Sequence, residues 1–291
     1  MKTFLQSSVG KIIRFVFIFL FVAAAVFLLL RRMNWQPLQS ANLQYNLVLA
    51  ILLVFLPLAA FLVVWALRFW GYRRKPWTVL VTAYALPLLA VIIIHLRLMA
   101  VDSPLLAGGL SANIYRSTWQ PLYYLWQTFV LLFSGWFLFP RSGAVRSASF
   151  KEMMAGLVTG LGLGLGAAFF CSILIHQFRL SGRVITTPDP PGLLLWMVLA
   201  VGLTLSPYAV QYFYRTILEP YWAKTYSEPV VILMTAAVFA LVQARLLLLP
   251  VAFAAGLGFS LLFRRTALWP AAVAHAVFNL VLFGLGWFLV I

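Results

Sequence analysis

The side chains of this chain that could do chemistry are concentrated near its C-terminus, inside an otherwise apolar segment. His275 and Asn279 stand there, within the sequence Trp-Pro-Ala-Ala-Val-Ala-His-Ala-Val-Phe-Asn. Since they are four residues apart, they would share one face of a helix. A polar pair in a membrane-length apolar segment is costly and marks a candidate functional site. The alternative is a hydrogen-bonded pair that only holds helices together.

Hydrolysis at this pair would need a base, and acidic residues are scarce. The chain has five Asp and Glu residues, none of them deep in an apolar run: Asp102, Glu152, Asp189, Glu219 and Glu228. A proton relay or an ion-coupled transporter would need acidic side chains inside the membrane, so this distribution counts against both. A zinc site would need three or four ligands at definable spacing, and the single cysteine and three histidines form no such pattern. We therefore expect no metal and no cofactor, and we interpret Ser260 as a packing residue.

The composition predicts the elements that hold these residues. The chain is 64% hydrophobic and only 9% charged, whereas soluble domains average about 25% charged residues. Apolar runs of about 20 residues are typical of transmembrane helices. We expect an all-α, polytopic membrane helix bundle with eight or nine transmembrane helices. The candidate spans are Ile12–Leu30, Tyr45–Leu67, Trp77–Leu96, Pro121–Phe139, Met153–Ile175, Leu193–Leu205, Val230–Val242, Leu246–Phe263 and Leu268–Ile291.

The net charge of +16 fits a membrane protein better than a nucleic-acid-binding one. The basic residues are scattered at the ends of the apolar runs instead of forming one basic folded surface or tail. With the N-terminus inside, the inner segments hold 14 of the Lys and Arg residues and the outer segments hold 7. This asymmetry predicts a cytoplasmic N-terminus in a bacterial cytoplasmic (inner) membrane. Membrane lipids are expected partners, because basic loops attract anionic headgroups.

The Pro-rich segment Thr187–Gly192 cannot be helical and suggests a boundary. We predict N-terminal transmembrane helices over residues 1–190 and a C-terminal helical core over residues 191–291.

Five glycines of the fifth span give three overlapping frames with a spacing of four: Gly156 with Gly160, Gly160 with Gly164, and Gly162 with Gly166. Such spacing lets helix backbones approach closely, so we interpret the glycines as packing residues. We find no internal repeat, which weakens a transporter interpretation.

The segment from Val201 to Val281 resembles the CPBP family, the membrane-embedded endopeptidases related to type II CAAX prenyl proteases and Abi-type proteins. His275 and Asn279 match that family's His-x-x-x-Asn motif. The lead-in Gly256–Pro270 is similar to the family's Gly-rich helix, Arg-Thr turn and Leu-Trp-Pro helix start.

Two other motifs of the family are altered in this chain. A Glu-Glu-x-x-x-Arg motif keeps its arginine as Arg215, but Val210 and Gln211 replace the glutamates. A Phe-x-x-x-His motif keeps Phe239, but Gln243 replaces the histidine. In the family the first glutamate is thought to activate water, while the histidines and asparagine position it and stabilise the oxyanion. The resemblance therefore implies a polar cavity without its general base.

We expect five side chains to converge on one intramembrane cavity: Gln211, Arg215, Gln243, His275 and Asn279. The favoured interpretation is a proteolytically inactive relative that binds a membrane protein or peptide partner, with no role in nucleic-acid binding. One alternative is an active endopeptidase that uses another base, such as Glu219 or His275. The other is a subunit of a transporter or membrane complex.

Overall fold

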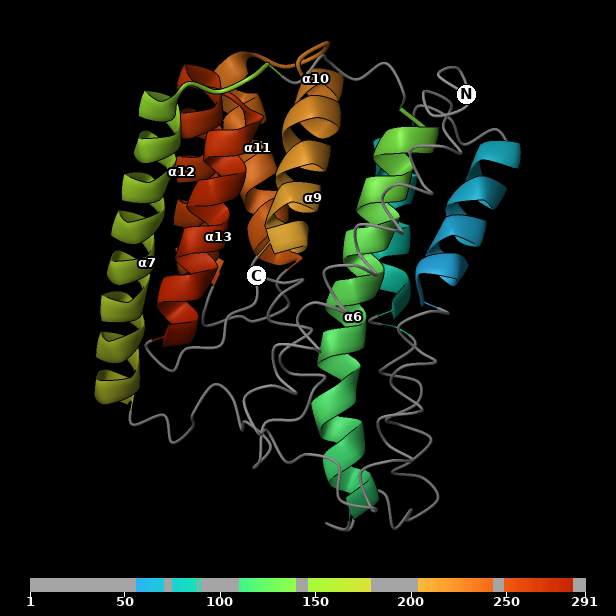
Figure 1. Ribbon diagram of the computed structural model, residues 1–291, viewed down its shortest axis with the longest axis horizontal. Helices are drawn as coiled ribbons and strands as arrows, with labels where there is room; N and C mark the ends of the chain where they lie inside the picture. Colours follow the sequence, from blue (N-terminus) through green and yellow to red (C-terminus); the bar gives the residue numbers. More distant parts are fainter. Residues whose placement is uncertain are drawn as a thin grey trace.

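The computed structural model describes residues 56–70, 75–87, 89, 110–139, 146–178, 204–242 and 249–284, and these parts are helical with no strand among them (Figure 1). The helices are α4 (Pro76–Leu80), α6 (Leu110–Phe137), α7 (Phe150–Phe178), α9 (Ser206–Phe213), α10 (Glu219–Trp222), α11 (Glu228–Leu241), α12 (Leu249–Arg265) and α13 (Leu268–Gly284), with π-helical segments η1 (Val81–Ala85) and η3 (Tyr214–Leu218). The prediction of an all-α fold is confirmed.

Helix lengths agree with a membrane protein without fixing the number of spans. Within the described residues, one helix is both long and apolar enough to cross a membrane, Phe150–Ile173. Four shorter apolar helices accompany it: Leu56–Phe69, Leu125–Phe137, Glu228–Leu241 and Leu268–Leu282. The expected first span, Ile12–Leu30, lies outside the described residues. Eight or nine transmembrane helices therefore stay a prediction.

Two expected boundaries are wrong. Helix α6 begins at Leu110, so Pro121 lies inside the helix instead of starting it. The expected span Leu193–Leu205 ends where the apolar run ends. Helical structure is present beyond that point, because α9, η3 and α10 follow one another without a break from Ser206 to Trp222. Glu219 therefore lies within this rod. The rod continues because its polar side chains bind other polar groups, as described below.

Helix α7 begins with a reciprocal pair of hydrogen bonds. The backbone N–H of Ser149 donates to Glu152 Oε2 at 2.8 Å, and the backbone N–H of Glu152 donates to Ser149 Oγ at 3.3 Å. This capping box satisfies two N–H groups that the first turn of a helix leaves without partners. Arg146 pairs with Glu152 and also donates to the carbonyl of Thr266, at 2.9 Å. The start of α7 is thereby joined to the turn between α12 and α13.

The glycines of α7 divide into two faces. On the face against α13, a Cβ at Gly156 would lie 2.5 Å from the carbonyl oxygen of Pro270, and one at Gly160 would lie 2.4 Å from that of Ala274. A Cβ at Gly164 would lie 2.8 Å from the side chain of Val281. Close packing is therefore confirmed for these three glycines. It is wrong for Gly162 and Gly166, where an added Cβ would meet nothing within 4 Å.

We expect Gly160→Ala to destabilise the protein, because the added methyl group meets a backbone oxygen that cannot turn away. Overpacking of this kind typically costs about 1–3 kcal/mol. Gly162→Ala is the matched control: it adds the same methyl group on the same helix, into open space, and should be neutral or slightly stabilising. Thermal unfolding in detergent should separate the two variants. Equal melting temperatures for both would contradict the packing described for α7 and α13.

Candidate functional site: a buried polar network

The rod from α9 to α10 supplies a row of polar side chains. Gln211, Arg215 and Glu219 follow one another at a spacing of four residues, and all three are buried. A spacing of four places side chains on one helix face. The middle part of the rod, η3, carries Arg215. Single π-helical turns inside α-helices occur frequently at functional sites.

Tyrosine contacts hold the outer side of this rod. Tyr214 donates its hydroxyl to that of Tyr84 at 3.4 Å, and Gln127 Nε2 donates to the same Tyr84 oxygen at 3.3 Å. Tyr84 belongs to η1 and Gln127 to α6. The rod is therefore held between these elements and the C-terminal helices α11 to α13.

Arg215 is the centre of the network. Its Nη1 contacts both the Glu219 carboxylate and the Ser260 hydroxyl, and its Nη2 donates to the carbonyl oxygen of Gly256 at 3.2 Å. Its Nε donates to Gln211 Oε1 at 3.0 Å. A buried charge is tolerated only when it is paired and hydrogen-bonded. Here one carboxylate balances the charge and three neutral oxygens accept the remaining hydrogen bonds.

The orientation of the Gln211 amide follows from these contacts. A guanidinium group can only donate, so the end of Gln211 that faces Arg215 must be the carbonyl oxygen. The other end, Nε2, is then a donor and lies 3.2 Å from His275 Nδ1. His275 Nδ1 must therefore accept, which places the imidazole proton on Nε2. Arg215 thus fixes the tautomer of His275 through Gln211.

Aromatic rings surround the imidazole. His275 is fully buried, stacks on Phe259 with ring centroids 5.0 Å apart, and meets the ring of Phe239 edge-on at 5.6 Å. Phe259 belongs to α12 and Phe239 to α11, so the imidazole is enclosed by rings from two neighbouring helices.

Glu219 connects the network to the surface of the molecule. Its Oε1 contacts Arg215 and accepts from Ser260 Oγ at 3.1 Å, while its Oε2 lies 3.2 Å from Arg264 Nη2. The side chain of Arg264 is 32% exposed and also pairs with Glu228 at 3.2 Å. The carboxylate of Glu219 is therefore bound by one buried arginine and one that reaches solvent.

The structure brings together three of the five predicted site residues: Gln211, Arg215 and His275. Asn279 is buried one turn further along α13, and Gln243 lies outside the described residues. Val210 is buried next to Gln211 and brings no polar atom to the site. The catalytic role of these residues stays a prediction.

Two residues of the network were missed or assigned another role. Ser260 was interpreted as packing, but its hydroxyl contacts both Arg215 and Glu219. Arg264 looked like an ordinary residue at a helix end. The four-residue spacing between Arg215 and Glu219 was the one sequence signal for the ion pair. Among the described residues, no three His, Cys, Asp or Glu side chains cluster in a way that could hold a metal ion.

The fold and the network define an all-helical membrane protein with a buried polar site in its C-terminal helices. Residues 191–281 match the family model of the type II CAAX prenyl endopeptidases, described as Rce1-like. The match covers every residue of the polar network and confirms the resemblance that His275, Asn279 and their lead-in indicated. Over these residues the chain is similar to the CPBP family. No curated protein and no solved structure matched the chain.

Proposed function

We propose that this protein is a non-hydrolysing relative of the type II CAAX prenyl endopeptidases that acts by binding a membrane protein or peptide. The observation that carries the proposal is the fixed direction of the hydrogen bonds from Arg215 through Gln211 to His275. A general base needs a free lone pair on a group that can reach the reacting water. The lone pair on His275 Nδ1 is occupied by the Gln211 amide, and its Nε2 carries the proton.

The other candidate base, Glu219, is engaged as well. Its carboxylate faces two arginines and the Ser260 hydroxyl. Each of its two oxygens lies against an arginine side chain, so neither is turned toward an open space where a reacting water could approach. This counts against an active enzyme that uses Glu219 as its general base. The remaining polar groups of the site are suited to binding a carbonyl group.

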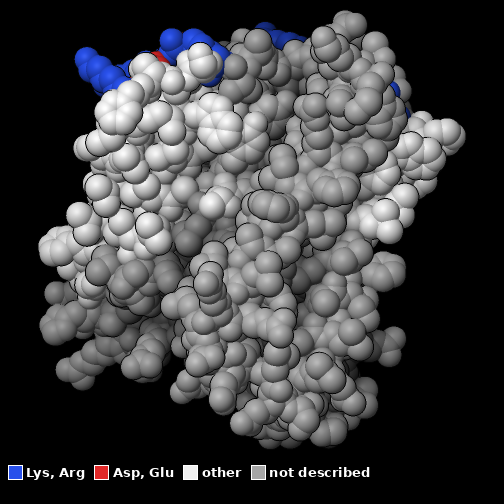
Figure 2. Space-filling view, viewed as in Figure 1, with Lys and Arg blue, Asp and Glu red and all other residues white. Residues whose placement is uncertain are grey.

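The basic residues support a location in the cytoplasmic membrane with this end of the helices inside. Figure 2 shows Lys and Arg side chains along one edge of the molecule, at the end where α7 begins and α12 ends. Arg146, Lys151, Arg264 and Arg265 belong to these two helix ends, and Lys224 follows α10. Positive residues favour the cytoplasmic side. Labelling of a cysteine at position 146 from outside intact cells would contradict this orientation.

We expect purified wild-type protein not to cleave prenylated or transmembrane peptides above the level of a His275→Ala variant. Both should be measured in detergent and in vesicles, with cleavage products identified by mass spectrometry. The same peptides, carrying a photoreactive group, should still crosslink saturably to the wild type. Cleavage by the wild type that is lost in His275→Ala would overturn the claim of inactivity. Failure to crosslink either peptide class, with no membrane protein co-purifying, would overturn the binding role.

A further inference from the structure

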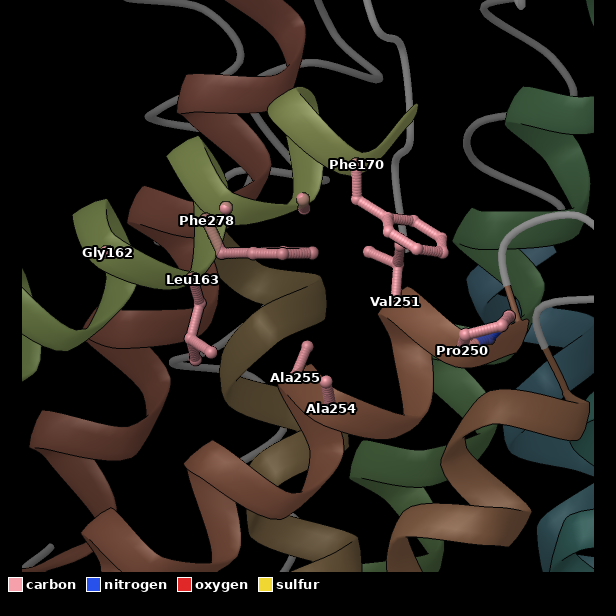
Figure 3. Close-up of a pocket in the computed structure, with 10 residues that line it drawn as sticks. Gly162, Leu163, Phe170, Pro250, Val251, Ala254, Ala255 and Phe278 are labelled. Atoms are coloured by element: carbon pink, nitrogen blue, oxygen red, sulfur yellow. The ribbon is translucent and has the colours of Figure 1, made fainter. Parts of the chain in front are cut away.

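An apolar groove lies between α7, α12 and α13, on the side of α7 that carries Gly162 and Gly166 (Figure 3). Its volume is 340 Å³, and every residue that lines it is apolar. The walls include Gly162, Gly166 and Phe170 from α7, Val251 and Ala254 from α12, and Phe278 from α13. It is distinct from the polar network, which faces the rod from α9 to α10.

The missing side chains of Gly162 and Gly166 create this space. A Cβ at either glycine would meet nothing within 4 Å, whereas glycines of the same helix that face α13 are tightly packed. Ala254 stands across the groove and is also small and exposed. The groove therefore results from small residues on the two helices that face each other across it.

The dimensions of the groove select a slender occupant. On α7 it runs from Gly162 to Phe170, which corresponds to about 12 Å at 1.5 Å per residue. A transmembrane helix crosses a hydrocarbon core of about 30 Å and would overhang this groove at both ends. None of the described residues that line the groove has a polar side chain that could bind a headgroup. We propose that the groove binds the acyl chain of a membrane phospholipid.

The position of the groove along α7 identifies the leaflet that supplies the chain. Gly162 follows Phe150 by twelve residues and Phe170 follows it by twenty, so they lie about 18 Å and 30 Å from the basic end of the helix. The hydrocarbon core is about 30 Å thick. The groove thus runs from just past the middle of the bilayer to the far interface. The chain comes from the leaflet opposite the basic end, with its methyl end near Gly162 and its ester end near Phe170.

Two aromatic rings connect the groove to the polar site. Phe278 lines the groove and packs edge-on against Phe259, with ring centroids 5.9 Å apart. Phe259 in turn stacks on His275. Phe278 and Phe259 thus form a continuous contact from the wall of the groove to the imidazole.

The test uses the full-length protein in phosphatidylcholine vesicles that contain a photoactivatable phosphatidylcholine. The diazirine is placed either near the methyl end or near the ester end of the acyl chain. After illumination, mass spectrometry should find the methyl-end probe around Gly162 and Ala254, and the ester-end probe around Phe170 and Pro250. Gly166→Leu should reduce this labelling at least fivefold by filling the groove. Ala254→Leu, which fills it from the other wall, should do the same.

Ser172→Leu is the control, because it adds bulk at an exposed position of α7 that does not line the groove. Labelling should be unchanged in this variant. The proposal is overturned if labelling is uniform along the exposed face of α7, if it is insensitive to Gly166→Leu and Ala254→Leu, or if the two probes label in the reverse order. It is also overturned if a prenylated peptide displaces the lipid and a free fatty acid does not. None of these outcomes depends on whether the protein cleaves peptides.

Discussion

Replacing Arg215 by methionine is expected to lower the free energy of unfolding by about 3–5 kcal/mol, the range found when one partner of a buried ion pair is removed. The variant would leave the buried Glu219 carboxylate with Arg264 as its charged partner, and it would remove the donor from Gln211, Ser260 and the Gly256 carbonyl. Thermal or chemical unfolding in detergent measures the loss. The effect should be the largest of any single substitution in the network.

Two further variants make this expectation specific to the ion pair. Arg215→Met combined with Glu219→Met removes both charges and should recover much of the lost stability, because a buried ion pair can often be replaced by apolar residues of similar size. Arg265→Met removes an exposed arginine of α12 and should change stability by less than about 0.5 kcal/mol. An Arg215→Met variant as stable as Arg265→Met would show that the network does not hold the helices together.

The second large effect is expected from restoring the family's motifs. A variant with Val210→Glu, Gln211→Glu and Gln243→His should gain cleavage of prenylated or transmembrane peptides, since general-base assistance is typically worth about 10²–10⁴-fold. A glutamate at position 211 could no longer donate to His275 Nδ1, so the proton would have to move to that nitrogen. The fixed direction of hydrogen bonding would be reversed.

The structure adds a fourth change to this design. Glu219 already balances the charge of Arg215, so two new glutamates would leave an excess of buried negative charge. Glu219→Gln in the same variant removes that excess, and it should raise both the yield of folded protein and the cleavage rate. The control adds His275→Ala and should abolish any activity gained. A folded fourfold variant that cleaves neither class of peptide would contradict the view that the site is inherited from a protease.

The sequence predicted helices well wherever apolar composition alone decides them. The expected spans over Met153–Ile175 and Val230–Val242 differ from α7 and α11 by a few residues at their ends. The rod from Ser206 to Trp222 was not predicted as one element. Its buried face carries an amide, a guanidinium and a carboxylate, so its hydropathy falls just where its side chains are most buried. Burial of paired charges cannot be inferred from hydropathy.

Part of the site could be predicted from the sequence. Four-residue spacing related His275 to Asn279, and the family resemblance added Gln211 and Arg215. The structure brings Gln211, Arg215 and His275 into contact. Ser260 was not predicted, because an isolated serine between apolar residues is compatible with packing or with a polar contact. The open face of Gly162 and Gly166 could not be predicted either, since their spacing is the same as that of the packed glycines and only the position of α13 distinguishes the two sets.

The π-helical segment η3 has a consequence for the part of the rod that follows it. A π turn is formally an α-helix that has received one inserted residue, and each residue of an α-helix turns the chain by about 100°. Loss of one residue between Tyr214 and Leu218 would therefore rotate everything after it by about that angle. Trp222, whose ring lies 5.3 Å from that of Trp77, would leave its place in the core, and Glu219 would swing away from Arg215. The one extra residue of the π turn therefore sets which face of the rod carries Glu219 and Trp222.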